Sequence, residues 1–123
     1  MNTGIVICAH GSPIESANQA VRDVAFQAGF ELCETGFLDP VRPSLAEAVG
    51  RLVERGASRI LVIPYFLTLG LHMQRDLPVI VHELSRISKG MQILVTPPLD
   101  GHPALREILL DRAREALTQE GGQ

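Results

Sequence analysis

The chain has 123 residues, which fits one domain, and its 46% hydrophobic and 20% charged residues are typical of a globular protein and exclude a disordered chain. The net charge of −3 excludes the basic surface of a nucleic-acid binder, and only 4% of residues are aromatic rings that could stack on bases. No apolar run reaches the ~20 residues of a membrane span and no signal peptide is recognisable, so we expect one cytoplasmic domain over residues 1–123, with residues 119–123 frayed.

The first part of the chain alternates between strand and helix patterns. Residues 5–9 form a continuous apolar run, which is typical of a strand buried on both faces. Residues 15–28 have the period of an amphipathic helix, and residues 30–38 predict a second strand. The buried face of the helix is expected to carry Ala17, Val21, Val24 and Ala28.

A capping box marks the start of a second helix. In the motif Ser-Leu-Ala-Glu, the Ser44 side chain is expected to accept a hydrogen bond from one backbone N–H while the Glu47 side chain accepts one from another. The helix is expected to end at Gly56, and residues 59–64 then form the clearest strand of the chain. The buried stripe of the helix is expected to be Leu45, Val49, Leu52 and Val53.

An apolar loop and a third helix follow that strand. Residues 65–71 predict the loop, and Asp76 with Pro78 predicts the helix start. The helix is expected to end at Gly90, and residues 91–96 predict a fourth strand. The buried side chains of the helix are expected to be Ile80, Leu84 and Ile87.

The last helix is expected to begin at Pro103, with His102 as its starting residue. The other helical histidine, His82, lies off the apolar stripe of its helix and is expected at the surface. The core face of the last helix is expected to be Leu105, Ile108, Leu109, Ala113, Ala116 and Leu117.

Strand and helix thus alternate four times, and strands separated by helices pair in parallel through right-handed crossovers. The predicted fold class is α/β, a single domain with an open four-stranded parallel sheet and helices on both faces. Cys8 and Cys33 lie in apolar strands and are expected to be reduced core residues. Ligands of such a sheet bind beyond the carboxyl ends of its strands.

Two imidazoles and a carboxylate are predicted at that edge. His10 follows the first strand, Asp39 the second, and His72 follows the third strand and its apolar loop. Imidazole and carboxylate suit a divalent transition metal such as iron, cobalt, nickel or zinc, and fewer than four protein ligands leave the metal exchangeable. The same imidazoles could accept protons at neutral pH.

Each of these residues also has a purely structural interpretation. His10 could be a polar group satisfied by turn amides, Asp39 part of a turn, and His72 a helix cap. The apolar loop of residues 65–71 could pack on its own domain, or form a wall for a flat macrocycle or for a second subunit.

Four motifs occur in order along the chain. They are His10-Gly11-Ser12, then Phe37-Leu38-Asp39 with Pro43-Ser44-Leu45, then the string Pro64-Tyr65-Phe66-Leu67 with Gly70-Leu71-His72 and Asp76-Leu77-Pro78, and finally Gly101-His102-Pro103. With these motifs the chain resembles the small sirohydrochlorin chelatases, the short CbiX-type members of the class II chelatases, from Gly4 to about Arg112. The string from Pro64 to Pro78 is the specific one, whereas His-Gly-Ser is weak by itself.

The resemblance implies that His10 and His72 handle the metal and accept protons, and that Asp39 stands where the family has Glu. The family inserts cobalt or iron, or nickel in some members, into sirohydrochlorin for cobalamin, siroheme or a nickel tetrapyrrole, without nucleotide hydrolysis. It implies no cofactor beyond that substrate metal ion. A one-domain chain is expected to form a homodimer that builds the cleft between its copies.

Further residues are expected to contact the tetrapyrrole. Ser12, Phe66 and Leu67 would line it, and Arg42 and Arg75 would pair with its carboxylates, unless these arginines are simply solvated. Two other functions stay open. The chain could be a non-catalytic metal or tetrapyrrole carrier, because Asp is one methylene shorter than Glu, or a phosphatase with His-Gly at a helix N-terminus, although Ala9 stands where histidine phosphatases have Arg.

Overall fold

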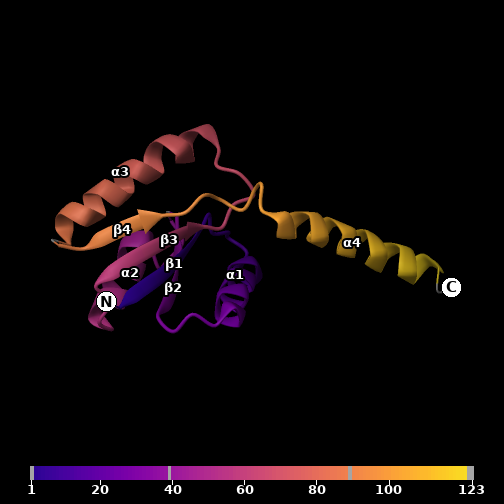
Figure 1. Ribbon diagram of the computed structural model, residues 1–123, viewed down its shortest axis with the longest axis horizontal. Helices are drawn as coiled ribbons and strands as arrows, with labels where there is room; N and C mark the ends of the chain where they lie inside the picture. The colour runs from indigo at the N-terminus through magenta and orange to yellow at the C-terminus, as the bar shows by residue number, and fades with distance from the viewer. Residues whose placement is uncertain (1, 39, 89, 122–123) are drawn as a thin grey trace.

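The computed structural model describes residues 2–38, 40–88 and 90–121, in which four strands and four helices alternate (Figure 1). Their bounds are β1 Thr3–Ala9, α1 Glu15–Ala28, β2 Cys33–Phe37, α2 Leu45–Glu54, β3 Arg59–Pro64, α3 Leu71–Ile87, β4 Gln92–Val95 and α4 Pro103–Gly121. The strands pair in parallel in the order β2-β1-β3-β4. The predicted α/β class and parallel sheet are confirmed, although the edge strands β2 and β4 are shorter than the patterns indicated.

One face of the sheet is closed by α2 and α3. Val6, Ile60 and Val62 of the central strands have no exposed surface there, and Leu52 of α2 is equally buried. Helix α3 adds Leu77 and Leu84 to the same cluster, and Leu45, Ala48 and Val49 add the rest of α2. The predicted stripe of α2 is therefore confirmed except at Val53, which is 39% exposed.

The capping box of α2 forms as predicted. The Ser44 Oγ atom accepts a hydrogen bond from the Glu47 backbone N–H at 3.1 Å, and the Glu47 Oε1 atom accepts one from the Ser44 N–H at 3.0 Å. These two bonds satisfy donors that would otherwise lack an intrahelical partner, and they begin α2 at the carboxyl edge of β2.

Helix α1 lies on the opposite face, where Ala25 and Val21 pack against Ile5 and Ile7 of β1. The predicted inner face of α1 was wrong at three positions: Ala17, Val24 and Ala28 are exposed. The helix is rotated because Asn18 is buried and bonds the loop that follows β1, and because the small Ala25 side chain lets the helix approach the sheet.

Helix α3 begins at Leu71, five residues before the predicted start at Asp76, and Pro78 lies inside it. The reason is packing, because Met73 and Leu77 contact the core and draw the first turns of the helix onto the sheet. Among the predicted inner residues Leu84 is buried and Ile80 is partly buried, whereas the side chain of Ile87 lies outside the described residues.

Helix α4 projects away from the sheet (Figure 1). Every residue from 106 to 119 is exposed, and Leu109 and Leu117 are 73% and 68% exposed, so the predicted core face of α4 is not buried in this chain. The linker before the helix explains its direction. Thr96 donates its N–H to the Val62 carbonyl at 3.0 Å and Leu99 donates to the Phe66 carbonyl at 2.8 Å, which holds the linker at the carboxyl edge of β3.

Candidate functional site

His10 lies at the carboxyl edge of the sheet, directly after β1, and its side chain is exposed. Its ring lies against the ring of Phe66, with the centroids 4.4 Å apart and the planes inclined by 60°. Phe66 is buried and follows the neighbouring strand β3, so the ends of the two central strands meet at this imidazole. The contact restrains the His10 ring while leaving it accessible to a ligand.

The turn after His10 requires a glycine. Gly11 has a φ of +79°, which side chains rarely adopt, and a Cβ atom at this position would lie 2.7 Å from the Cβ atom of Val41. Val41 belongs to the loop between β2 and α2, so this loop packs directly on the loop of His10. The carboxyl ends of β1, β2 and β3 therefore converge as the sequence predicted.

Ser12 and Asn18 stabilise the same turn. The Ser12 N–H donates to the Asn18 Oδ1 atom at 2.7 Å, and the Asn18 Nδ2 atom donates to the Ser12 carbonyl at 2.8 Å. The Ser12 Oγ atom accepts from the Ile14 N–H at 3.0 Å. The role of Asn18 was not predicted from the sequence, although an amide in the first turn of a helix that follows a His-Gly-Ser loop was the available signal.

The other two predicted metal ligands cannot be placed as side chains. Asp39 lies outside the described residues, as does the side chain of His72, although the backbone of His72 is in the first turn of α3. In the part of the chain that the structure describes, no three His, Cys, Asp or Glu side chains gather closely enough to hold a metal. The set of His10, Asp39 and His72 stays a prediction.

The two predicted arginines differ in their surroundings. Arg42 binds Glu47 through its Nε atom at 2.9 Å and through a second, shorter contact. The Arg42 guanidinium, with the Ser44 backbone N–H, lowers the pKa of Glu47 to about 2, and Glu47 in turn raises the pKa of Arg42. Arg75 is exposed on α3.

The apolar loop is divided between core and surface. Phe66 is buried, whereas Leu67 and Leu71 are 66% and 70% exposed. Beside the loop, a hollow of about 510 Å³ lies between α3 and the end of β4, and its apolar lining is Leu69, Met73, Leu77, Pro78, Val81 and Val95. Exposed and hollowed apolar surface therefore continues from the loop along α3.

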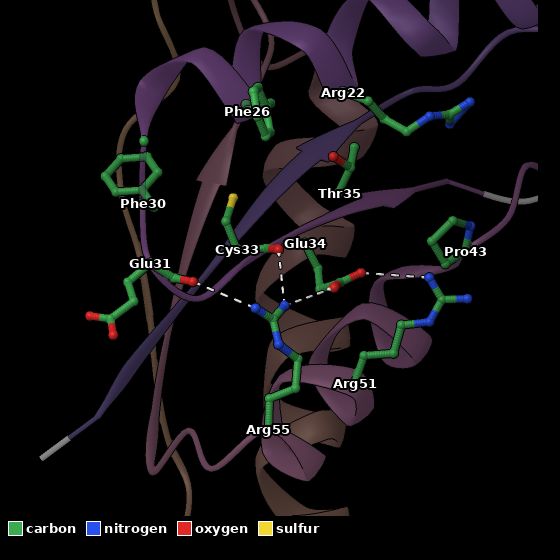
Figure 2. A pocket seen from close by; sticks show the side chains of 12 residues that line it. Arg22, Phe26, Phe30, Glu31, Cys33, Glu34, Thr35, Pro43, Arg51 and Arg55 are labelled. Atoms are coloured by element: carbon green, nitrogen blue, oxygen red, sulfur yellow. Dashed lines mark hydrogen bonds and ion pairs between the residues drawn. The ribbon is translucent and has the colours of Figure 1, made fainter.

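A second hollow, of about 550 Å³, lies along the edge strand β2 (Figure 2). Its cations already have partners, because Arg55 and Arg51 lie 3.1 and 3.5 Å from the carboxylate of Glu34. His10 lines neither hollow. Arg51, Arg55 and Glu34 thus form structural ion pairs in this hollow, and the hollow is separate from the histidine site.

The remaining polar residues have structural roles. His102 accepts a hydrogen bond from the Ala104 N–H at its Nδ1 atom, at 3.0 Å, so it starts α4 as predicted, and His82 is exposed as predicted.

Cys8 and Cys33 are free thiols. Burial raises the pKa of Cys8 to about 11, and burial also raises the pKa of Cys33. Both thiols therefore stay protonated at neutral pH, when they are weak metal ligands. None of the helices in the described ranges combines the length and hydropathy needed to cross a membrane.

Comparison with known proteins relates the chain to one family. The family model of CbiX matches residues 4–116. The chain is 33% identical over 120 residues to a sirohydrochlorin cobaltochelatase of Sulfolobus acidocaldarius, with 96% of this chain and 95% of the relative covered. It is 29% identical over 123 residues to the chloroplastic sirohydrochlorin ferrochelatase of Arabidopsis thaliana, with 97% of this chain and 55% of the relative covered.

Two solved structures share the fold. A CbiX protein from Marinobacter aquaeolei VT8 superposes with a TM-score of 0.88 at 24% identity, covering 98% of this chain and 99% of that one. The sirohydrochlorin chelatase SirB of Bacillus subtilis subspecies spizizenii, solved in complex with cobalt, gives a TM-score of 0.72 at 24% identity, covering 80% of this chain and 44% of that one. Because the match to the Marinobacter protein covers 98% of this chain, it includes residues of α4.

Proposed function

This chain belongs to the CbiX family, and from that membership we propose that it is a sirohydrochlorin chelatase. It is a lyase that inserts cobalt or iron into sirohydrochlorin for the biosynthesis of cobalamin or siroheme, without nucleotide hydrolysis. The observation that carries the proposal is the relationship over nearly the whole length to a cobaltochelatase of the same size. Nickel, and a tetrapyrrole related to sirohydrochlorin, remain within the proposal as alternative substrates.

The proposed mechanism assigns the metal and the protons to the two histidines. Insertion of a divalent metal replaces two pyrrole N–H protons, so the site must deliver a cation and accept protons in the same place. His10, restrained by Phe66 on a turn that Gly11 and Asn18 stabilise, is suited to do both. His72 in the first turn of α3 and Asp39 complete the proposed ligand set.

The tetrapyrrole is proposed to lie on the apolar surface beside His10. Phe66, Leu67 and the hollow along α3 would contact the flat ring, since ligand sites are mostly apolar with a few placed polar groups. Arg75 would pair with a carboxylate of the ring. Arg42 would have to share its guanidinium with Glu47, and Ser12 would contact the ring from the turn.

A homodimer is proposed as the active form, with the second copy closing the cleft. A one-domain chain presents a single carboxyl edge to the substrate, and a symmetric partner would supply the opposite wall. The cytoplasmic location expected from the sequence stays a prediction.

The test is anaerobic insertion of cobalt, iron and nickel into sirohydrochlorin, followed by the change in its absorption spectrum. Wild-type protein accelerates insertion, and His10→Ala and His72→Ala each lose roughly 100-fold or more, the usual contribution of a proton-transferring group. His102→Asn is the matched control, because it removes the imidazole of an exposed histidine that lines neither hollow while asparagine can still cap α4, and it is expected to leave the rate unchanged.

Two results would contradict the proposal. A folded His10→Ala variant with the full rate would remove His10 from the mechanism. Wild-type protein that binds sirohydrochlorin at equilibrium but accelerates insertion of no metal would be a carrier, a function that the replacement of the family Glu by Asp39 favours.

A further inference from the structure

The hollow beside β2 brings aromatic rings and guanidinium groups together (Figure 2). Phe26 lies in the last turn of α1 and Phe30 follows the end of that helix, while Arg51 and Arg55 belong to α2. Phe26 is 87% exposed and Phe30 is 44% exposed. Because both rings line the same hollow, they form one apolar wall rather than scattered surface residues.

The arginines of α2 keep donors for a further anion. Arg55 donates to the carboxylate of Glu34 at 3.1 Å, and it also donates to the carbonyl oxygens of Glu31 and Cys33, each at 3.5 Å. Arg51 lies 3.5 Å from the same Glu34 carboxylate. A guanidinium has more N–H donors than these contacts use, and both side chains are exposed. Since one carboxylate serves two cations, the cluster keeps a net positive charge.

The open edge of β2 adds a backbone donor to the hollow. Strand β2 ends the sheet, so it pairs with β1 on one side only. The Leu38 N–H bonds to β1, whereas the Phe37 N–H bonds outward, to the Pro43 carbonyl. Backbone groups alternate in direction along a strand, so Thr35 turns its N–H and its carbonyl outward as Phe37 does, into the hollow that it lines.

The cations are spread along the hollow rather than gathered at one point. Arg22 comes from α1, on the opposite face of the sheet from Arg51 and Arg55, and its ion-pair partner Glu15 does not line the hollow. This spread suits an anion whose charges stand apart around an apolar body, whereas a single phosphate would need the donors to converge.

We propose that the hollow beside β2 is a second binding site, for a flat conjugated molecule that carries several carboxylates. The rings of Phe26 and Phe30 contact its apolar face, and Arg51 and Arg55 bind its carboxylates. His10 does not line this hollow, so a molecule bound here is held apart from the metal-inserting histidine.

The inference deepens the proposed function, because a carboxylated tetrapyrrole such as sirohydrochlorin belongs to this class of ligand. Only the identity of the ligand in the cell rests on the proposed function, whereas its chemical class rests on the lining of the hollow. The site stores a tetrapyrrole beside the one that receives the metal.

The experiment is a titration of the full chain with uroporphyrin, a carboxylated porphyrin, followed by the porphyrin fluorescence. We expect two bound molecules per chain, one at each site. Phe26→Ala and Arg51→Gln each weaken binding at this hollow by about ten-fold or more, so one molecule is lost. Both side chains are exposed, so the variants fold, and their rate of metal insertion at saturating sirohydrochlorin equals that of the wild type.

Two matched controls lie on α3. Val79→Ala shortens an exposed apolar side chain and Arg86→Gln removes an exposed guanidinium, and neither residue lines a hollow. Both variants are expected to bind as much uroporphyrin as the wild type. A porphyrin with cationic instead of carboxylate substituents tests the charge, and we expect it not to bind beside β2.

Two outcomes would overturn the inference. Phe26→Ala and Arg51→Gln chains that bind as much uroporphyrin as the wild type, with the same affinity, would show that this hollow holds no ligand. Equal binding of the cationic porphyrin beside β2 would show that the arginines do not select carboxylates. Failure of the proposed function gives a different result, because a chain that inserts no metal but loses a bound uroporphyrin in both variants keeps this site.

Discussion

The two faces of the sheet differ in how completely the chain covers them. On the side of α2 and α3, Val6, Ile60 and Val62 have no exposed surface, whereas on the side of α1 the residues next to them on β3 remain partly exposed. The apolar character of β3 is the same on both sides. The difference therefore comes from the helices, and it shows that one face is complete within one chain while the other is not.

The connections of the helices explain this difference. Helices α2 and α3 are each joined to a strand at both ends, so the chain itself holds them against the sheet. Helix α4 follows β4 through a linker that is hydrogen-bonded at the carboxyl edge. This linker directs the helix away from the sheet (Figure 1).

The largest effect is expected on the closed face, the side of the sheet that α2 and α3 cover. Leu52→Ala removes a fully buried side chain between α2 and the sheet, and we expect a loss of roughly 3 kcal/mol in the free energy of unfolding, from lost burial and the cavity left behind. Urea denaturation measures it. The loss should be the same at all protein concentrations, and a concentration-dependent loss would contradict the closed character of this face.

A smaller effect is expected on the open face, the side of the sheet that α1 covers in part. Leu61→Ala shortens a side chain that its own chain covers only partly, so we expect a loss of about 1 kcal/mol when the protein is dilute. Urea denaturation of dilute protein measures it. A loss as large as that of Leu52→Ala would contradict the open character of this face.

The smallest effect concerns the start of α2. Ser44→Ala removes one half of the capping box, and we expect a loss of about 1 kcal/mol in the free energy of unfolding, measured by thermal or urea denaturation.

The other half of the capping box, the Glu47 carboxylate, makes a contribution that depends on pH. The folded state lowers the pKa of Glu47 from 4.5 to about 2, so its stabilising contribution is complete above about 4.5 and is lost as the pH falls towards 2.

Glu47→Gln is the control for this pH dependence. The variant keeps a hydrogen-bonding side chain without the carboxylate, so the part of the acid destabilisation that belongs to Glu47 should disappear. An unchanged pH profile in the variant would show that other carboxylates account for the acid destabilisation of the wild type.

Much of the fold was predictable because its signals are local. The capping box at Ser44 and the apolar run of β3 each depend on a few neighbouring residues. The start of α3 was wrong because distant packing of Met73 outweighed the local signal of Asp76 and Pro78. The pattern of α4 predicted an amphipathic helix, but it could not show that the linker, bonded to Val62 and Phe66, directs the helix away from the sheet.

The candidate site was predictable in position rather than in detail. Placing His10 needed only the end of a buried strand and the rule that parallel strands end at one edge. The contact with Phe66 and the hydrogen bonds of Asn18 depend on side-chain directions, which no spacing reveals. The roles of Asp39 and His72 in the reaction stay predictions.

The order of the elements along the chain has a consequence for folding. Every strand of the described sheet, together with α1, α2 and α3, precedes α4, so the sheet can close before α4 finds a surface. During synthesis the strands leave the ribosome before α4 does, so the sheet can form without waiting for the last helix.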